Sequence, residues 1–311
     1  MEVHTSHLVV SPVPHVRASL TIRRVMANVI LALLPALVAS VLIFGLRALL
    51  VTVVTVAACV VMEWAWCALR HEKQTVGDLS AVVTGLLLAF NLPSTVPLYL
   101  PVIGAAAAIL VTKQLFGGIG HNFANPAIVG RIALAVSFPS LMTAYPYPAT
   151  MSGVDILSSA TPLAAHGQSL PLLDLFLGTH GGVLGETCAL ALLIGFGWLL
   201  FTRTVELTIP LAYLGTVALM SLVFGYSVPT QLLSGGLLLG AFFMATDYTT
   251  SPFTRKGKLI FGVGCGLITC AIRFWGNMNE GVSYSILLMN LMVPYINAKT
   301  RKTPMGGGKR K

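Results

Sequence analysis

Apolar residues form long runs along most of the chain, and short polar or Gly- and Pro-rich segments separate these runs. Residues 25–44, VMANVILALLPALVASVLIF, reach the roughly 20 residues that a helix needs to cross a bilayer. On that criterion we predict ten candidate spans, at residues 25–44, 48–69, 79–92, 98–116, 124–138, 183–200, 207–225, 232–245, 259–275 and 282–296. The pattern therefore predicts an all-α polytopic membrane protein with about ten transmembrane helices.

Composition supports this fold class and excludes several functions. Of 311 residues, 56% are hydrophobic and 9% are charged, against about 25% charged residues in a soluble domain. The net charge of +9 does not indicate a nucleic-acid partner, because the lysines and arginines lie at the ends of apolar runs. The five cysteines include no CxxC pair, and we expect no metal site. Walker, HExxH and GxSxG motifs are absent, so ATP-driven or hydrolytic chemistry is not supported.

The distribution of positive charge predicts the orientation of the spans. If both termini are cytoplasmic, that side receives the arginines of residues 1–24, charges near helix ends such as Lys113, and the basic tail at residues 298–311. The other side then receives little beyond Arg47 and Arg273, as the positive-inside rule requires. Residues 139–182 contain no lysine or arginine, so we expect them to form an external loop.

Two predicted spans are too short to cross the bilayer. Residues 79–92 and 232–245 would cover only about 20 Å at 1.5 Å per residue, whereas the hydrocarbon core is about 30 Å thick. Their sequences, SAVVTGLLLAFNLP from Ser80 and SGGLLLGAFFMATDYTTSP from Ser234, share a Ser, Gly, Leu-Leu-Leu, Ala, Phe pattern. We interpret them as the broken third helices of two five-helix repeats, residues 25–138 and 183–297; the alternative is chance recurrence of short apolar motifs. An odd number of spans inverts the second repeat, which predicts a site near the midplane, where helix ends and unwound backbone meet.

Three carboxylates in or beside the spans are candidates for an ion path. Asp247 directly follows the second short span, where a carboxylate needs a cation, a donor or a water-filled cavity. It could instead cap the turn before Pro252 through an Asx hydrogen bond. Glu63 and Glu186 lie within or near apolar segments, and pairing of one of them with Arg131 would make the set structural.

Asparagines are concentrated in two linkers that each lead into the fifth span of a half. Asn122 and Asn125 belong to LFGGIGHNFANPAIVG, and Asn277 and Asn279 to FWGNMNEGVSYSILLM. They could hydrogen-bond a planar polar ligand at the repeat interface, or only satisfy the loop backbone.

Seven segments, spread in order over almost the full length, carry a resemblance to a known family. They are SPVPHVRASLTIRRVM, TGLLLAFNLP, GHNFANPAIVG, DILSSATPL, LFLGTHGGVLGE, AFFMATDYTTSP and EGVSYSILLMN. With them the chain resembles the NqrB/RnfD family, which comprises the RnfD proteins of Rnf electron transport complexes and the NqrB proteins of sodium-translocating NADH:quinone reductases. The short amino-terminal segment is closer to the Rnf type, and the quinone-reductase type is the alternative within the family.

The resemblance implies a flavin bonded to a residue of the external loop. The family attaches FMN through a phosphodiester to the threonine of a Ser/Thr-Gly-Ala-Thr motif, and this chain has Ser158, Ser159, Ala160 and Thr161 there, shortly after Asp155. Thr161 is thereby nominated as the flavin-bearing residue, and Ser159 departs from the usual glycine. Pro162 restrains Thr161 to extended geometry, which presents its hydroxyl; an unmodified loop threonine is the alternative.

The resemblance also implies the wider function. The chain is expected to carry electrons in an Rnf-type ferredoxin:NAD+ oxidoreductase of a prokaryotic cytoplasmic membrane and to couple this flow to Na+ or H+ export. Its partners would be the other proteins of an Rnf complex and a flavin transferase, and a second, non-covalent flavin, riboflavin, would suit the asparagine linkers. The rivals are a flavin-free permease like the urea transporters, which share the inverted five-span architecture, and a redox-silent scaffold protein.

Overall fold

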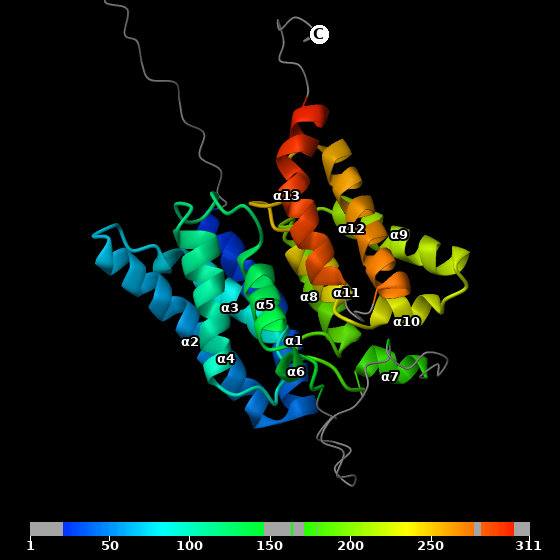
Figure 1. The fold of residues 1–311 in the computed structure, drawn as a ribbon, viewed down its shortest axis with the longest axis horizontal. Coiled ribbons are helices and arrows are strands. Elements are labelled where there is room, and N and C mark those ends of the chain that lie inside the picture. Colours follow the sequence, from blue (N-terminus) through cyan, green and yellow to red (C-terminus); the bar gives the residue numbers. More distant parts are fainter. Residues whose placement is uncertain (1–20, 146–162, 164–170, 179, 277–280, 302–311) are drawn as a thin grey trace, which may run out of the picture.

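In the part of the chain that the structure describes, all regular secondary structure is helical and no strand is present (Figure 1). This computed structural model describes residues 21–145, 163, 171–178, 180–276 and 281–301. The first half contains α1 (Ile22–Phe44), α2 (Leu46–Leu69), the short η1 (Val76–Asp78), α3 (Ser80–Phe90), α4 (Tyr99–Ala106), the π-helical η2 (Ala107–Gln114), α5 (Pro126–Ser137) and α6 (Pro139–Met142). The second contains α7 (Leu172–Leu177), α8 (Ala189–Phe201), α9 (Thr208–Val223), α10 (Val228–Leu233), α11 (Leu237–Leu239), the π-helical η4 (Gly240–Met244), α12 (Arg255–Trp275) and α13 (Val282–Thr300).

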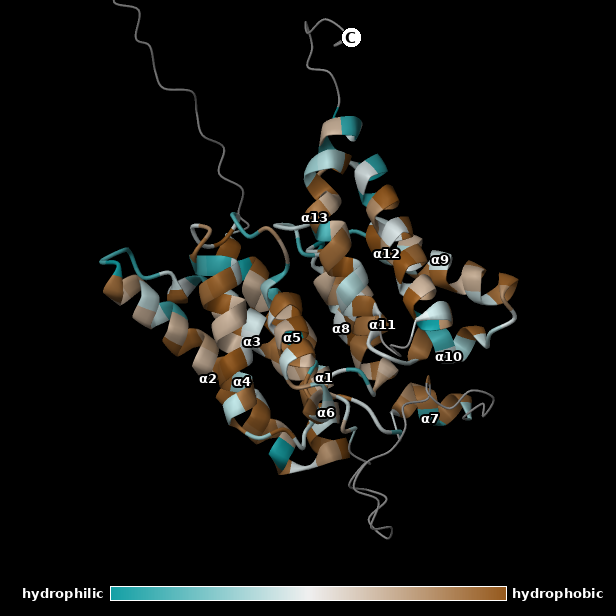
Figure 2. Ribbon diagram, in the orientation of Figure 1, coloured by the Kyte–Doolittle hydropathy of each residue, from teal (hydrophilic) through white to brown (hydrophobic). Residues whose placement is uncertain are grey.

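The helices have the apolar surface of a membrane protein. By length and composition, α1, α2 and α12 are each able to cross a bilayer, and five shorter helical stretches are also apolar. Apolar side chains remain exposed along the outside of the bundle, among them Leu42, Leu219 and Leu222. Figure 2 shows that apolar residues extend along most helices, with polar positions gathered mainly at loops and helix ends. The predicted polytopic membrane fold is confirmed.

The two short spans are present as short helices. α3 has 11 residues, and its counterpart runs only from Leu237 to Met244, first as α11 and then as η4. Gly236 has a φ of 68°, a left-handed backbone conformation that residues with a side chain rarely adopt, and this allows the chain to turn into α11.

The sixth span begins later than its hydropathy predicts. Residues 183–188 are not helical, and α8 starts at Ala189. The Leu184 and Gly185 amides instead donate to Leu92 O (3.1 Å) and Phe90 O (2.9 Å). These bonds satisfy carbonyls that the end of a short helix leaves without intrahelical partners. The predicted start of the sixth span at Val183 is therefore wrong, because the backbone there bonds to the end of α3 instead of forming a helix.

Corresponding helices of the two halves pack against each other. α1 contacts α8, the helix of the first span of the second half, and α5 contacts α13, the helix of its fifth span. At the first contact, Gly195 leaves no room for a Cβ beside Ala32 O, so the two backbones approach closely. Within each half the second helix packs on the fourth, α2 on α4 and α9 on α12. A two-fold repeat would produce this pairing; the limits 25–138 and 183–297 remain a prediction.

The bundle has two distinct ends. Figure 1 shows that the start of α1 and the end of α13 lie at one end. α6 and α7, which flank residues 146–170, lie at the other. Both ends of the helical core therefore emerge on the side opposite to the helices that border the predicted external loop.

Candidate functional site

A buried ion pair joins the second and fourth helices of the first half. We call the residues around it the lysine cluster: Glu63, Thr75, Asp78, Ser80 and Lys113. Lys113 Nζ lies 2.7 Å from Glu63 Oε2 and donates to Ser80 Oγ at 2.6 Å. The side chains of Lys113 and Glu63 are 3% and 0% exposed. Lys113 was predicted only as a charge near a helix end, and its ammonium instead points into the bundle, where it is buried.

Glu186, a second candidate carboxylate, is also paired with a basic residue. Glu186 Oε1 accepts from Arg131 Nη1 at 3.0 Å, and the same nitrogen donates to Asn91 Oδ1 at 2.5 Å. Arg131 belongs to α5, Asn91 follows α3, and Glu186 precedes α8, so this contact ties the two halves together. Both charged side chains are almost fully buried. The pairing of a carboxylate with Arg131, anticipated as the structural alternative, is observed.

A second arginine lies at the break before α11. Arg273 Nη1 donates to Gln231 O at 2.6 Å, and its Nη2 donates to Ser234 O and Gly235 O, both at 3.1 Å. The guanidinium thus binds carbonyls that the end of α10 leaves free. Arg273 also interacts electrostatically with Glu186. The assignment of Arg273 to an external loop is corrected, since its side chain is buried. We call Asn91, Arg131, Glu186 and Arg273 the arginine cluster.

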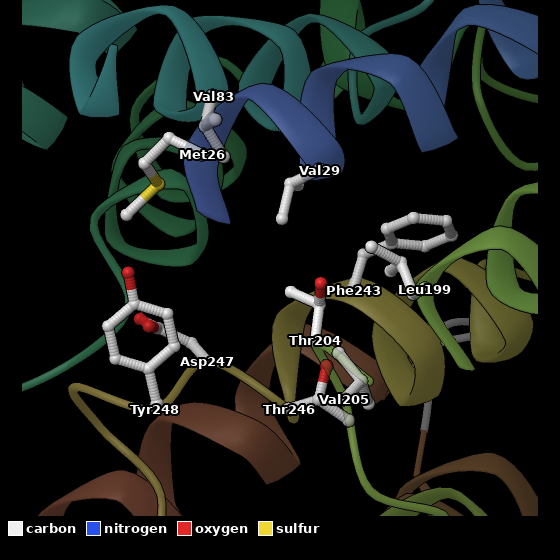
Figure 3. Close-up of a pocket in the computed structure, with 10 residues that line it drawn as sticks. All are labelled: Met26, Val29, Val83, Leu199, Thr204, Val205, Phe243, Thr246, Asp247 and Tyr248. Carbon is white, nitrogen blue, oxygen red and sulfur yellow. The ribbon is translucent and has the colours of Figure 1, made fainter. Parts of the chain in front are cut away.

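Asp247 makes turn-stabilising bonds and also faces a pocket. Its carboxylate accepts from the Thr249 amide at 3.1 Å and from Thr249 Oγ1 at 2.8 Å, which is the Asx arrangement of the structural alternative. The pocket lies between α1, α3, α8 and the end of η4, and Figure 3 shows Asp247 and Tyr248 on one side of it with Met26 across from them. Its walls are mostly apolar, with Thr204, Thr246, Asp247 and Tyr248 as the polar groups, and a more polar pocket adjoins it through Thr204, Thr246 and Tyr248.

The two asparagines of the first linker have different surroundings. Asn125 caps α5 by accepting from the Ala127 amide at 3.0 Å, and its Nδ2 donates to Met244 O at 3.3 Å, across the two halves. Asn122 Oδ1 is buried without a hydrogen-bond partner among the residues that the structure describes. Asn277 and Asn279 fall outside those residues.

The nominated flavin-attachment residues also fall outside the described part of the chain. These are Asp155, Ser158, Ser159, Ala160 and Thr161. The nearest described residue is Leu163, which is buried. Its side chain packs on Gly235, and Arg273 Nη2 lies on the same glycine, at 3.0 Å from the position a Cβ would take. Leu163 and Arg273 therefore flank one residue at the start of the second broken helix.

Comparison with known proteins agrees with the resemblance seen in the motifs. The model of the NQR2, RnfD, RnfE family matches residues 9–306. The chain belongs to this family. It is 46% identical over 96% of both chains to the D subunit of the Na(+)-translocating ferredoxin:NAD(+) oxidoreductase complex of Acetobacterium woodii. It is 39% identical, again over 96% of both, to the proton-translocating counterpart of Clostridium ljungdahlii, and 38% identical over 92% of both to the D subunit of the ion-translocating oxidoreductase complex of Stutzerimonas stutzeri.

Lys113 and Arg273 are the buried charges of this family member that motif analysis missed as site residues. Each lies near the end of the fourth helix of its half and reaches the segment where the broken third helix begins, at Ser80 in one case and at Ser234 in the other. A signal was present in the repeat pattern, because both precede the glycine-containing linkers to the fifth helices at similar spacing. The positive-inside count used both residues only to predict orientation, so this similar spacing was not interpreted.

Proposed function

We propose that this chain is the flavin-bearing membrane subunit of an Rnf-type, ion-translocating ferredoxin:NAD+ oxidoreductase. The single observation that carries the proposal is the 46% identity over 96% of both chains to the Acetobacterium woodii protein. The chain works in a prokaryotic cytoplasmic membrane, with both termini inside and the Thr161 loop outside, as part of an assembly with other Rnf proteins. A flavin transferase attaches the FMN to the chain.

FMN bonded to Thr161 is the first cofactor of the proposal. Thr161 precedes the described residue Leu163 by two positions in the sequence. The arginine cluster near Leu163 has two guanidinium groups and one carboxylate, so its excess positive charge suits a phosphodiester. Arg273 and Arg131 would hold the anionic linkage near the second broken helix. When bound, the flavin supplies one-electron transfer.

A second, non-covalent flavin is assigned to the pocket beside Asp247 together with the more polar pocket that adjoins it. Mostly apolar walls with a few polar groups are typical of sites for flat cofactors. Phe243, Val29 and Met26 would contact the ring system, and Thr204 and Thr246 would offer hydroxyls. Asn122 and Asn125 stay candidates for polar contacts of a flavin, although no lining residue of this pocket comes from their linker.

Ion translocation is the final part of the proposal. Glu63, Glu186 and Asp247 are its candidate ion-path residues, since ionisable groups within membrane spans usually mark pathways or relays. Glu63 and Glu186 each have a basic partner, and Asp247 faces a pocket, so Asp247 is the carboxylate most open to an ion. The relatives' names divide between Na+ and protons.

Complementation of a deletion strain tests the proposed function. We expect membrane vesicles without this chain to lose ferredoxin-dependent NAD+ reduction and the associated ion uptake, and to regain both when the chain is restored. Flavin-free chain that takes up a small polar solute, without restoring NAD+ reduction, would contradict the proposal and favour the permease.

Filling the pocket tests the second flavin separately. Val29→Trp adds an indole at the pocket wall, so we expect at least tenfold less non-covalent flavin to be extracted from the purified complex, with the covalent FMN retained. The matched control is Val53→Trp, because Val53 is 56% exposed on the outside of α2. Equal flavin release from both variants would show that the pocket does not hold it.

A further inference from the structure

The more polar of the two pockets lies between the turn that joins α8 to α9 and the start of α12. Thr254 Oγ1, at the cap of α12, donates to Thr300 Oγ1 at the end of α13, at 2.7 Å. Asn28, near the start of α1, donates to Thr204 Oγ1 of the turn at 3.4 Å. The pocket therefore lies at the end of the bundle where α1 begins and α13 ends, which the positive-inside rule assigns to the cytoplasm.

The lining of this pocket has an excess of positive charge. Its charged side chains are those of Arg203, Glu206 and Lys258. Lys258 Nζ lies 2.8 Å from Glu206 Oε2, so these two charges offset each other. Arg203 has no acidic partner in the part of the chain that the structure describes. Two basic groups against one acidic group leave one positive charge, which a single phosphodiester anion would neutralise.

The start of α12 adds to this excess. Arg255, Lys256 and Lys258 lie there, and no acidic residue is present in the first turn. This arrangement is unfavourable, because the amino-terminal end of a helix already carries a partial positive charge. An anion bound beside Arg203 and Lys258 would offset both the unpaired guanidinium and this end of the helix.

Apolar side chains are exposed directly beside the charged residues of the pocket. Leu207 is 46% exposed where α9 begins, and Leu259 and Ile260 are 53% and 47% exposed next to Lys258 in α12. A ligand at this position would therefore meet cationic groups and a lipid-facing apolar surface together. An anion dissolved in water would use only the cationic groups, so the combination favours a lipid.

We infer that Arg203 and Lys258, at the rim of the polar pocket, bind the phosphate of an anionic phospholipid such as phosphatidylglycerol. The planar guanidinium can donate two hydrogen bonds to the phosphate oxygens. Lys258 has three N–H donors, so it can bond to the phosphate and to Glu206 at the same time. The acyl chains contact the exposed apolar side chains beside the pocket. Basic pockets between membrane helices on the cytoplasmic side are typical sites for acidic lipid head groups.

The lipid and the second flavin use different parts of the pocket. Thr204, Thr246 and Tyr248 are shared with the apolar pocket beside Asp247, and they stay available to the flavin. The phosphate needs only the charged rim. The lipid site goes beyond the proposed function and requires neither a bound flavin nor a redox reaction.

Titration of the purified full-length chain with lipid, followed by native mass spectrometry, tests the site. Phosphatidylglycerol and phosphatidylcholine with the same acyl chains differ mainly in head-group charge. We expect the tightest bound lipid to be phosphatidylglycerol, with an affinity at least about tenfold above that of phosphatidylcholine. Arg203→Gln should abolish this preference and leave the phosphatidylcholine affinity unchanged. Arg203→Lys keeps the charge and should retain most of the preference.

The matched control is Arg24→Gln, because Arg24 is exposed at the same end of the bundle but does not line the pocket. It should keep the full preference for phosphatidylglycerol. Equal affinities for the two lipids in the unsubstituted chain, or equal losses in Arg24→Gln and Arg203→Gln, would overturn the inference.

Competition distinguishes the lipid from other sources of phosphate. We expect neither inorganic phosphate nor free FMN to displace phosphatidylglycerol from the chain. Displacement by inorganic phosphate would show a site for a free anion and overturn the lipid assignment. Displacement by FMN but not by riboflavin would assign the rim to a nucleotide phosphate and overturn it too. Each of these failures leaves flavin attachment and NAD+ reduction unaffected, so it is distinguishable from failure of the proposed function.

Discussion

Thr161→Ala is expected to abolish the fluorescent flavin band that this chain carries through denaturing electrophoresis. Only a covalent bond survives denaturation, and alanine has no hydroxyl to form the phosphodiester. The same variant should lose nearly all ferredoxin-dependent NAD+ reduction by the assembled complex, since the loss removes an electron carrier. In-gel fluorescence of membranes from the native host, with immunodetection of the chain in the same lane, measures the effect.

Thr143→Ala is the control for this experiment, because Thr143 directly follows α6 and, among the described residues, its hydroxyl bonds only to Pro139 O and Ser140 O of its own helix turn. Its band should match that of the unsubstituted chain. Ser159→Gly restores the glycine usual in the family and should be labelled at least as completely. A band of full intensity in Thr161→Ala would show that the flavin is attached to another residue.

Glu186→Met is expected to produce the largest loss of stability. The substitution removes the carboxylate that bonds to buried Arg131 and that also attracts buried Arg273. Removing one partner of a buried ion pair destabilises a protein by about 3–5 kcal/mol, because the remaining charge is uncompensated. Thermal unfolding in nanodiscs measures this, on chain produced without the flavin transferase so that no phosphate can substitute for the carboxylate.

The double variant Arg131→Met/Glu186→Met separates charge from packing. It removes both members of the pair and should recover at least half of the lost stability, because replacing a whole buried pair by apolar groups is often near neutral. For comparison, Lys258→Met breaks an exposed pair and should change stability by less than about 1 kcal/mol. If the double variant were no more stable than Glu186→Met, uncompensated charge would not be the cause.

Span lengths and hydropathy were sufficient to predict the helical fold and its two short helices. A helix of residues 79–92 or 232–245 is shorter than the hydrocarbon core is thick, and this comparison does not depend on the neighbouring segments. The start of α8 was mispredicted for the opposite reason. The apolar residues at the start of this predicted span, such as Leu184, pack on the end of α3, and hydropathy does not distinguish such residues from those of a helix.

The site was less predictable because its charges depend on tertiary contacts. The pairing of Arg131 with a carboxylate could be anticipated, since a guanidinium within a span needs a partner. Lys113 and Arg273 lie near predicted helix ends, where the positive-inside rule treats a basic residue as a loop charge. Only the three-dimensional arrangement shows that both side chains point inward, one to Glu63 and the other to the break before α11.

Mass spectrometry of the chain matured in its native host tests the central claim most directly. After protease digestion, we predict that the peptide containing Thr161 carries the mass of FMN less one water, and that fragmentation places this addition on Thr161. An unmodified Thr161 peptide in chain that is assembled into its complex would contradict the account.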